Sequence, residues 1–116
     1  MADSDETPLD DAGEGPQLKQ VRIRKQYSGE IVGTGIAVVL LAQGGAGSGY
    51  VASERVTGTL LGRSGSFVVQ HVGVADGSEL EAHGVVVPHS GTGELAGIAG
   101  RAYEAEMGVL TLELDT

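Results

Sequence analysis

Glu54 and His71 are the two residues whose chemistry could carry a proton, and they flank one predicted hairpin. Residues 62–65 read Gly-Arg-Ser-Gly, a strong turn signal between two strand-like runs. With these four residues as the loop, Leu60 faces Phe67, and Glu54 lies diagonally across from His71 within reach of a cross-strand pair. A loop one residue longer or shorter would turn one strand over, so this geometry depends on the turn.

The same pairing places the larger apolar side chains on the face that carries Glu54 and His71. That face consists of Glu54, Val56, Leu60, Phe67, Val69 and His71. Charged and polar groups in an apolar interior are costly unless they pair or meet a polar ligand, and a nearby carboxylate tends to raise the pKa of an imidazole. The pair could therefore move a proton during an isomerisation. The structural alternative places both groups at a rim, where they satisfy each other or nearby backbone.

The remaining polar residues give weaker signals. His83 and His89 add two imidazoles, but three histidines without ligand spacing predict no metal site. The Ser-Gly-Thr-Gly run at 90–93 lacks the strand-to-helix context of a phosphate loop, and the chain has no Gly-x-Ser-x-Gly elbow. The absence of cysteine excludes thiolate chemistry and Cys-based zinc sites. We therefore expect no metal and no cofactor.

Length and charge narrow the classes of partner. The 116 residues with a net charge of −9 describe one acidic domain, and this charge disfavours nucleic acid. Arg22, Arg24 and Lys25 form the one basic cluster, which we expect to be a solvated strand face. No apolar run is long enough to cross a membrane, and the acidic N-terminus does not resemble a signal peptide. We expect a cytoplasmic protein without a nucleic-acid or membrane partner.

The chain divides into an acidic leader, residues 1–16, and a β domain, residues 17–116. The leader has too little apolar surface to offset its ordering entropy, so we expect it to be disordered or to act as a lid. Alternating residues and turn signals predict strands over 17–27, 30–41, 50–61, 66–74, 79–87, 92–98, 101–106 and 109–114. Such a meander predicts a small antiparallel β-barrel of about eight strands, with room inside for side chains or one small ligand.

The strand at 30–41 is apolar on both of its faces. Ile36, Val38 and Leu40 lie on the face that a barrel strand would turn to water. Contiguous exposed apolar residues usually mark an interface, so we expect a homo-oligomer that forms through this strand. The competing explanation is a central strand of a two-layer sandwich, buried on both sides.

Two long stretches resemble a bacterial family of unknown function whose fold is like the allene oxide cyclase barrel. They are Glu54–Leu60 followed by Gly62–Gly73, and Ser90–Gly100. Shorter likenesses occur at Pro8–Asp11 and Tyr27–Glu30. The resemblance implies the same barrel, but this chain lacks a recognisable first strand before its acidic segment. An open edge would then need the leader or a partner chain to cover it.

Fold relatives of that family include allene oxide cyclases, dirigent proteins and bacterial cyclases of natural-product pathways, which steer ring closure by shape. Fold alone does not fix function. Our leading hypothesis is a cofactor-independent cyclase or isomerase for a small apolar metabolite, in which Glu54 and His71 are catalytic. The side chains expected to hold the substrate are Tyr50, Val56, Leu60, Phe67, Val69 and Tyr103. The alternatives are a non-catalytic barrel that binds a lipophilic small molecule and a structural oligomerising domain.

Overall fold

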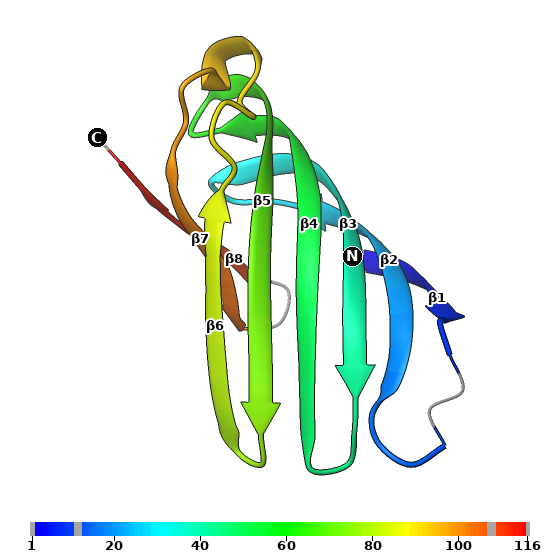
Figure 1. Ribbon diagram of the computed structural model, residues 1–116. Coiled ribbons are helices and arrows are strands. Elements are labelled where there is room, and N and C mark those ends of the chain that lie inside the picture. The colour runs from blue at the N-terminus through cyan, green and yellow to red at the C-terminus, as the bar shows by residue number, and fades with distance from the viewer. Residues whose placement is uncertain (1, 11–12, 107–108, 116) are drawn as a thin grey trace.

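The protein forms one antiparallel sheet of eight strands in sequential order, as the computed structural model shows for residues 2–10, 13–106 and 109–115 (Figure 1). The strands are β1 (Ala2–Pro8), β2 (Gln17–Tyr27), β3 (Ile31–Gln43), β4 (Gly47–Leu60), β5 (Arg63–Asp76), β6 (Glu79–Val86), β7 (Gly100–Glu106) and β8 (Val109–Leu114). The all-β prediction is confirmed. No helix in these ranges is long and apolar enough to span a membrane.

The sheet curls without closing. Strands β7 and β8 pass behind the layer made by β4 to β6 (Figure 1), yet β8 and β1 do not pair within the part of the chain that the structure describes. The join between β6 and β7 is narrow, because its ladder consists of the single pair Val85↔Arg101. The closed barrel expected from the meander is therefore an open, curled sheet.

The acidic leader supplies the first strand of this sheet. β1 pairs with β2 from Ala2↔Lys25 to Pro8↔Lys19. Asp5 Oδ2 lies 3.4 Å from Arg24 Nη1, which adds an ion pair across the ladder. Composition alone led us to expect a disordered leader or a lid. Composition indicates how much apolar surface a segment can bury, but it does not indicate whether its backbone forms the hydrogen bonds of a strand ladder. Residues 2–8 instead form the edge strand of the sheet beside β2.

The predicted strand over 92–98 is wrong. This segment is a loop that contains the short 3-10 helix η1 (Gly93–Leu95). Gly93 and Gly97 have φ angles of +59° and +85°, which an extended strand does not allow. Its apolar residues Leu95 and Ile98 are buried and cover one end of the core.

The hairpin between β4 and β5 turns at Leu61 and Gly62, and not over 62–65. Positive φ angles of +50° and +83° at these two residues are typical of a two-residue type I′ loop. Phe67 consequently pairs with Val56 instead of Leu60, four positions along β4 from the predicted partner. A shift by an even number of residues leaves every side chain on its predicted face.

That even shift preserves the central geometric prediction. Glu54 pairs with Val69, and His71 pairs with Ala52, so the acid and the imidazole are still diagonal neighbours on the inner face. This face packs against β7, β8 and η1. The buried core consists of Ile31, Val56, Leu60, Phe67, Val69, Val86, Leu95, Ile98 and Ala102.

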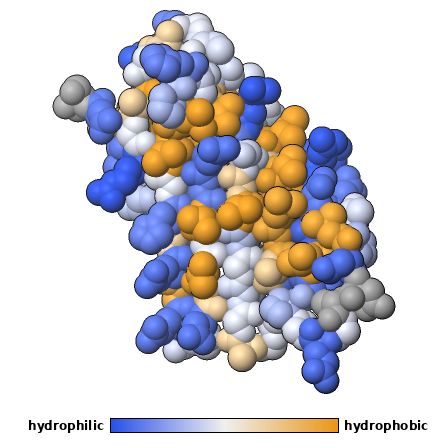
Figure 2. Space-filling view, viewed as in Figure 1, coloured by the Kyte–Doolittle hydropathy of each residue, from blue (hydrophilic) through white to orange (hydrophobic). Residues whose placement is uncertain are grey.

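The outer face of the sheet carries the exposed apolar residues predicted for the strand at 30–41. Ile36 is 51% exposed and Leu40 47% exposed, and Val51 and Val85 extend the patch over β4 and β6 (Figure 2). A groove of about 1000 Å³ runs across this face. The described strands form one sheet, so the two-layer sandwich alternative does not hold.

Three glycines lie side by side on β3, β4 and β5, in the row Gly33↔Gly58↔Gly65. Their φ angles are +155°, +149° and +156°, a region that L side chains rarely adopt. A Cβ atom on Gly58 would stand 2.1 Å from the carbonyl oxygen of Val32 and 2.8 Å from Cα of Gly33. The row therefore allows three backbones to approach one another where the sheet bends.

Replacing Gly58 with Ala should lower the free energy of unfolding by more than about 2 kcal/mol, because the new methyl meets backbone that cannot move aside. Urea denaturation followed by circular dichroism would measure the change. Gly45→Ala is the matched control, since nothing lies within 4 Å of its added Cβ. Equal stability of the two variants would contradict a packing role for the glycine row.

Candidate functional site

A fully buried carboxylate, that of Glu54, stands at the centre of the inner face. The side chain of Glu54 is 0% exposed. Its Oε1 accepts a hydrogen bond of 2.9 Å from Lys25 Nζ, and its Oε2 accepts one from the hydroxyl of Tyr27. Lys25 Nζ also donates to Oε1 of Glu104. The network thus joins β2, β4 and β7.

Gly35 makes room for this network on the strand between β2 and β4. A Cβ at this position would lie 2.3 Å from Glu54 Oε2 and 2.9 Å from Cε2 of Tyr27. Because Gly35 has no side chain, Tyr27 can reach across β3 to the carboxylate. The glycine on the inner face is therefore part of the construction of the site.

His71 lies beside the carboxylates on β5 and is 7% exposed. Its Nδ1 is 3.3 Å from the hydroxyl of Tyr50, and the two rings meet edge to face with centroids 5.4 Å apart. The Tyr50 ring fits over Gly73, where an added Cβ would lie 2.3 Å from ring atom Cε1. The other ring nitrogen of His71, Nε2, is buried and has no hydrogen-bond partner among the described residues.

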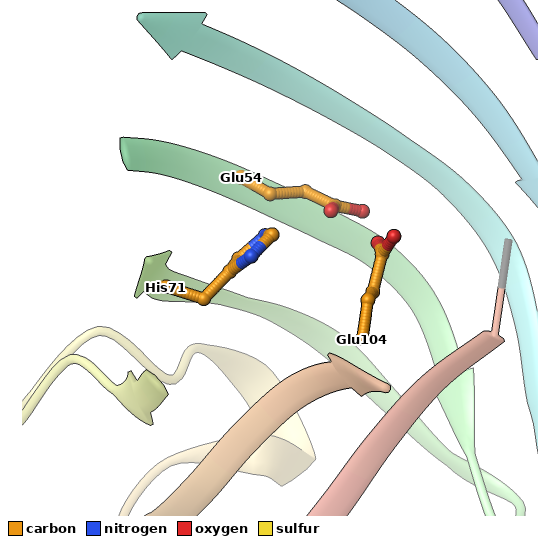
Figure 3. Close-up of side chains that lie close together, drawn as sticks. All are labelled: Glu54, His71 and Glu104. Carbon is orange, nitrogen blue, oxygen red and sulfur yellow. The ribbon is translucent and has the colours of Figure 1, made fainter. Parts of the chain in front are cut away.

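Glu54, His71 and Glu104 converge from three different strands (Figure 3). Each offers one potential ligand atom, and these atoms all lie within 4.8 Å of one another. Two carboxylates and an imidazole are suited both to proton transfer and to holding a metal ion. Chain spacing gave no hint of this set, because the sheet and not a local motif brings the residues together.

Burial and charge fix the protonation states at neutral pH. Burial lowers the pKa of His71 below its ordinary value of 6.5 and outweighs the opposing charge of Glu104, so the ring is neutral. The sequence suggested a raised value for this group. Burial also opposes the ammonium of Lys25, but its bond to Glu104 and the charge of Glu54 prevail and raise its pKa. Burial and the bond to Glu54 raise the pKa of Tyr27, which keeps its proton.

An aliphatic cleft of about 480 Å³ opens at the end of the sheet where β2 turns into β3. Leu60 and three leucines of β8 line it, and Tyr27 belongs to its wall. Tyr27 therefore connects the cleft with the buried carboxylate, since its hydroxyl donates to Glu54.

Comparison with known proteins assigns the chain to a family. A family described as "Protein of unknown function (DUF3224)" matches residues 1–115. The chain belongs to the DUF3224 family. A crystal structure of a DUF3224 protein of unknown function from Shewanella oneidensis MR-1 is 34% identical in sequence, with a TM-score of 0.76. The match covers 97% of this chain and 92% of that one. No curated protein matches the chain.

The expected bacterial family of unknown function is thus confirmed. Within this DUF3224 fold, two of the predicted substrate-binding residues border the polar cluster or the cleft, namely Tyr50 beside His71 and Leu60 in the cleft wall. Val56, Phe67 and Val69 are at most 1% exposed and pack in the core.

Tyr103 lies on the opposite face of the sheet from this cluster. Its neighbours in sequence, Ala102 and Glu104, point inward, and Tyr103 lines the outer groove together with Val38 and Leu40. The alternation of β7 therefore separates it from Glu54 and His71.

Lys25, Tyr27 and Glu104 are site residues that sequence reasoning missed. Lys25 was grouped with Arg22 and Arg24 as a solvated cluster, although alternation along 17–27 places it with Tyr27 on the apolar face. Its side chain is 12% exposed. The alternation was the available signal for these two residues. Nothing local identified Glu104, because its partner lies 79 positions away in the chain.

The ring of His71 should titrate with a midpoint below 6.5, because burial disfavours the imidazolium. Histidine NMR signals followed from pH 8 to 4.5 would give the midpoint, and the spectrum of His71→Gln would assign the signal. With the folded-state pKa below the unfolded one, the stability from this group is present above pH 6.5 and is lost as pH falls through the folded value. A midpoint above 6.5 would show that the carboxylates prevail over burial.

Proposed function

We propose that this protein is a cofactor-independent isomerase or cyclase that moves a proton on a small, largely apolar molecule. The observation that carries the proposal is the buried Nε2 atom of neutral His71, which has no hydrogen-bond partner among the described residues, in a ring that has a nitrogen within 4.8 Å of an oxygen of each of two carboxylates. Glu54 and His71 are the catalytic groups of this proposal.

The free-energy cost of burying these charged side chains supports a functional role for the cluster. An ion pair removed from water adds little stability compared with apolar residues of the same volume, because desolvation offsets the attraction. Glu54, Glu104 and Lys25 nevertheless occupy the interior beside a well-packed aliphatic core. Titratable groups with environments of this kind concentrate at functional sites.

The proposed chemistry is a proton shuttle. With the Nδ1 proton of His71 shared with Tyr50, Nε2 accepts a proton from a substrate carbon. The resulting imidazolium is stabilised by the nearby carboxylates of Glu54 and Glu104. Delivery of a proton from this imidazolium, which can first exchange with solvent, to a different atom of the substrate completes an isomerisation or a ring closure without an oxidant or reductant.

The aliphatic cleft supports an apolar substrate. Its volume of about 480 Å³ lies within the range of small-molecule sites, and leucines dominate its wall. The proposal shares this logic with the allene oxide cyclase-like barrels that the sequence resembles, in which shape steers ring closure. Of the polar cluster, only Tyr27 lines this cleft, so a substrate would have to extend past Tyr27 to reach Glu54 and His71. Orientation against the cleft would then contribute to the rate.

A non-catalytic binding protein is the second candidate function. The observation that favours it is the saturation of Glu54, whose two oxygens already accept bonds from Lys25 and Tyr27. A ligand held in the aliphatic cleft against Tyr27 would then leave the protein chemically unchanged.

Proton transfer can be tested without knowledge of the substrate. The small-molecule fraction of a bacterial extract, incubated with the protein in D₂O, should yield a compound that gains deuterium or changes retention in mass spectrometry. The double variant Glu54→Gln/His71→Gln should slow this conversion by at least about 100-fold. The control Glu81→Gln/His83→Gln makes the same replacements at exposed positions and should behave as the wild type. Undiminished conversion by the first variant would remove both residues from the mechanism, and a recovered but unaltered ligand would favour the binding function.

We also propose that the outer apolar face joins two copies of the chain. Ile36 and Leu40 are about half exposed, and Leu40 lines a broad groove with Val38, an arrangement typical of interfaces. Ile36→Glu/Leu40→Glu should convert an oligomer into a monomer in sedimentation velocity, because charges on this face resist desolvation. Leu80→Glu, which alters an exposed apolar residue at the end of the inner face, should leave the oligomer intact. A monomeric wild type would overturn this proposal.

A further inference from the structure

We propose that Glu54, Glu104 and His71 form a binding site for one divalent transition-metal ion, and that Lys25 is the resident cation that such an ion displaces. The proposal concerns the three groups whose ligand atoms lie within 4.8 Å of one another (Figure 3).

The donor set suits the ion. Protein ligands hold Zn²⁺ at about 2.0–2.2 Å, so neighbouring donor atoms in a tetrahedral site stand roughly 3.5 Å apart. Separations of up to 4.8 Å need to close by at most about 1.3 Å, which a change in the side-chain torsions of two glutamates can supply. Three protein ligands would leave one coordination position open. An imidazole among carboxylates favours zinc-like ions over Mg²⁺.

His71 gives an independent indication of a missing partner. Its Nε2 is buried with no hydrogen bond from the described residues, while Nδ1 is occupied by Tyr50. A buried polar atom without a partner costs free energy, and a metal ion would satisfy it. Donation of the Nδ1 proton to the Tyr50 hydroxyl oxygen would also fix the orientation of the ring, as partners of metal-bound histidines do.

The charges of the cluster also favour a divalent ion. The two carboxylates of the cluster share a single ammonium, that of Lys25. Exchange of the ammonium for a divalent ion would balance the charge. Lys25 ends a long flexible side chain that is 12% exposed, so its ammonium can move towards water when the ion enters.

Calorimetric titration of the full metal-free chain with Zn²⁺ tests the site. We expect one Zn²⁺ per chain and no comparable binding of Mg²⁺. His71→Gln and Glu104→Gln should each weaken Zn²⁺ binding at least tenfold. His83→Gln, which removes an exposed imidazole, should not. Lys25→Met should strengthen Zn²⁺ binding at least tenfold, because it removes the competing cation.

The proposal is overturned if the wild type shows no saturable Zn²⁺ binding, if His71→Gln and Glu104→Gln bind as the wild type does, or if His83→Gln abolishes binding. Should Lys25→Met fold poorly when metal-free, its melting temperature with and without Zn²⁺ replaces the titration. A rise on addition of Zn²⁺ supports the site, and an unchanged value overturns it. A bound ion would occupy Nε2 of His71, so the proposed proton transfer belongs to the metal-free protein. No substrate enters the Zn²⁺ measurements, so their failure is distinguishable from a failure of the proton-transfer test.

Discussion

The interior of this protein depends on the solvation of one carboxylate. Glu54 has no contact with water, and a buried charge without partners would cost several kcal/mol. Lys25 and Tyr27 replace the lost water with two hydrogen bonds, and Glu104 shares the ammonium. These bonds link β2 to both β4 and β7, so the polar cluster joins strands that are distant in the order of the sheet.

The apolar core and the polar cluster are complementary parts of one face. Val69 pairs directly with Glu54 and with Val86, so aliphatic side chains exclude water right up to the carboxylate. Low polarity strengthens every electrostatic interaction within the cluster and keeps His71 neutral. Small residues provide the space, since Gly35 and Gly73 lie beneath the two tyrosine rings.

Sequence patterns determined which face each strand presents, but not which strands meet. The inner positions of Glu54 and His71 followed from alternation and survived an incorrect turn, because the register error was even. Local patterns failed at two places. The leader is held by backbone pairing with β2, and the loop around η1 is shaped by the conformation of its glycines. Contacts such as Lys25 with Glu104 depend on curvature, which no local window contains.

The narrow join between β6 and β7 gives the β7–β8 hairpin the character of a flap. One ladder pair holds its edge, whereas β4 and β5 share fourteen pairs along their length. Separation there would break fewer ladder bonds than separation of β4 from β5, although it would also uncover Ala102 and the β8 leucines that pack on the core. Glu104 travels with the flap, so each outward excursion would withdraw one carboxylate from Lys25. Such a movement would also take the charge of Glu104, which raises the pKa of His71, away from the imidazole.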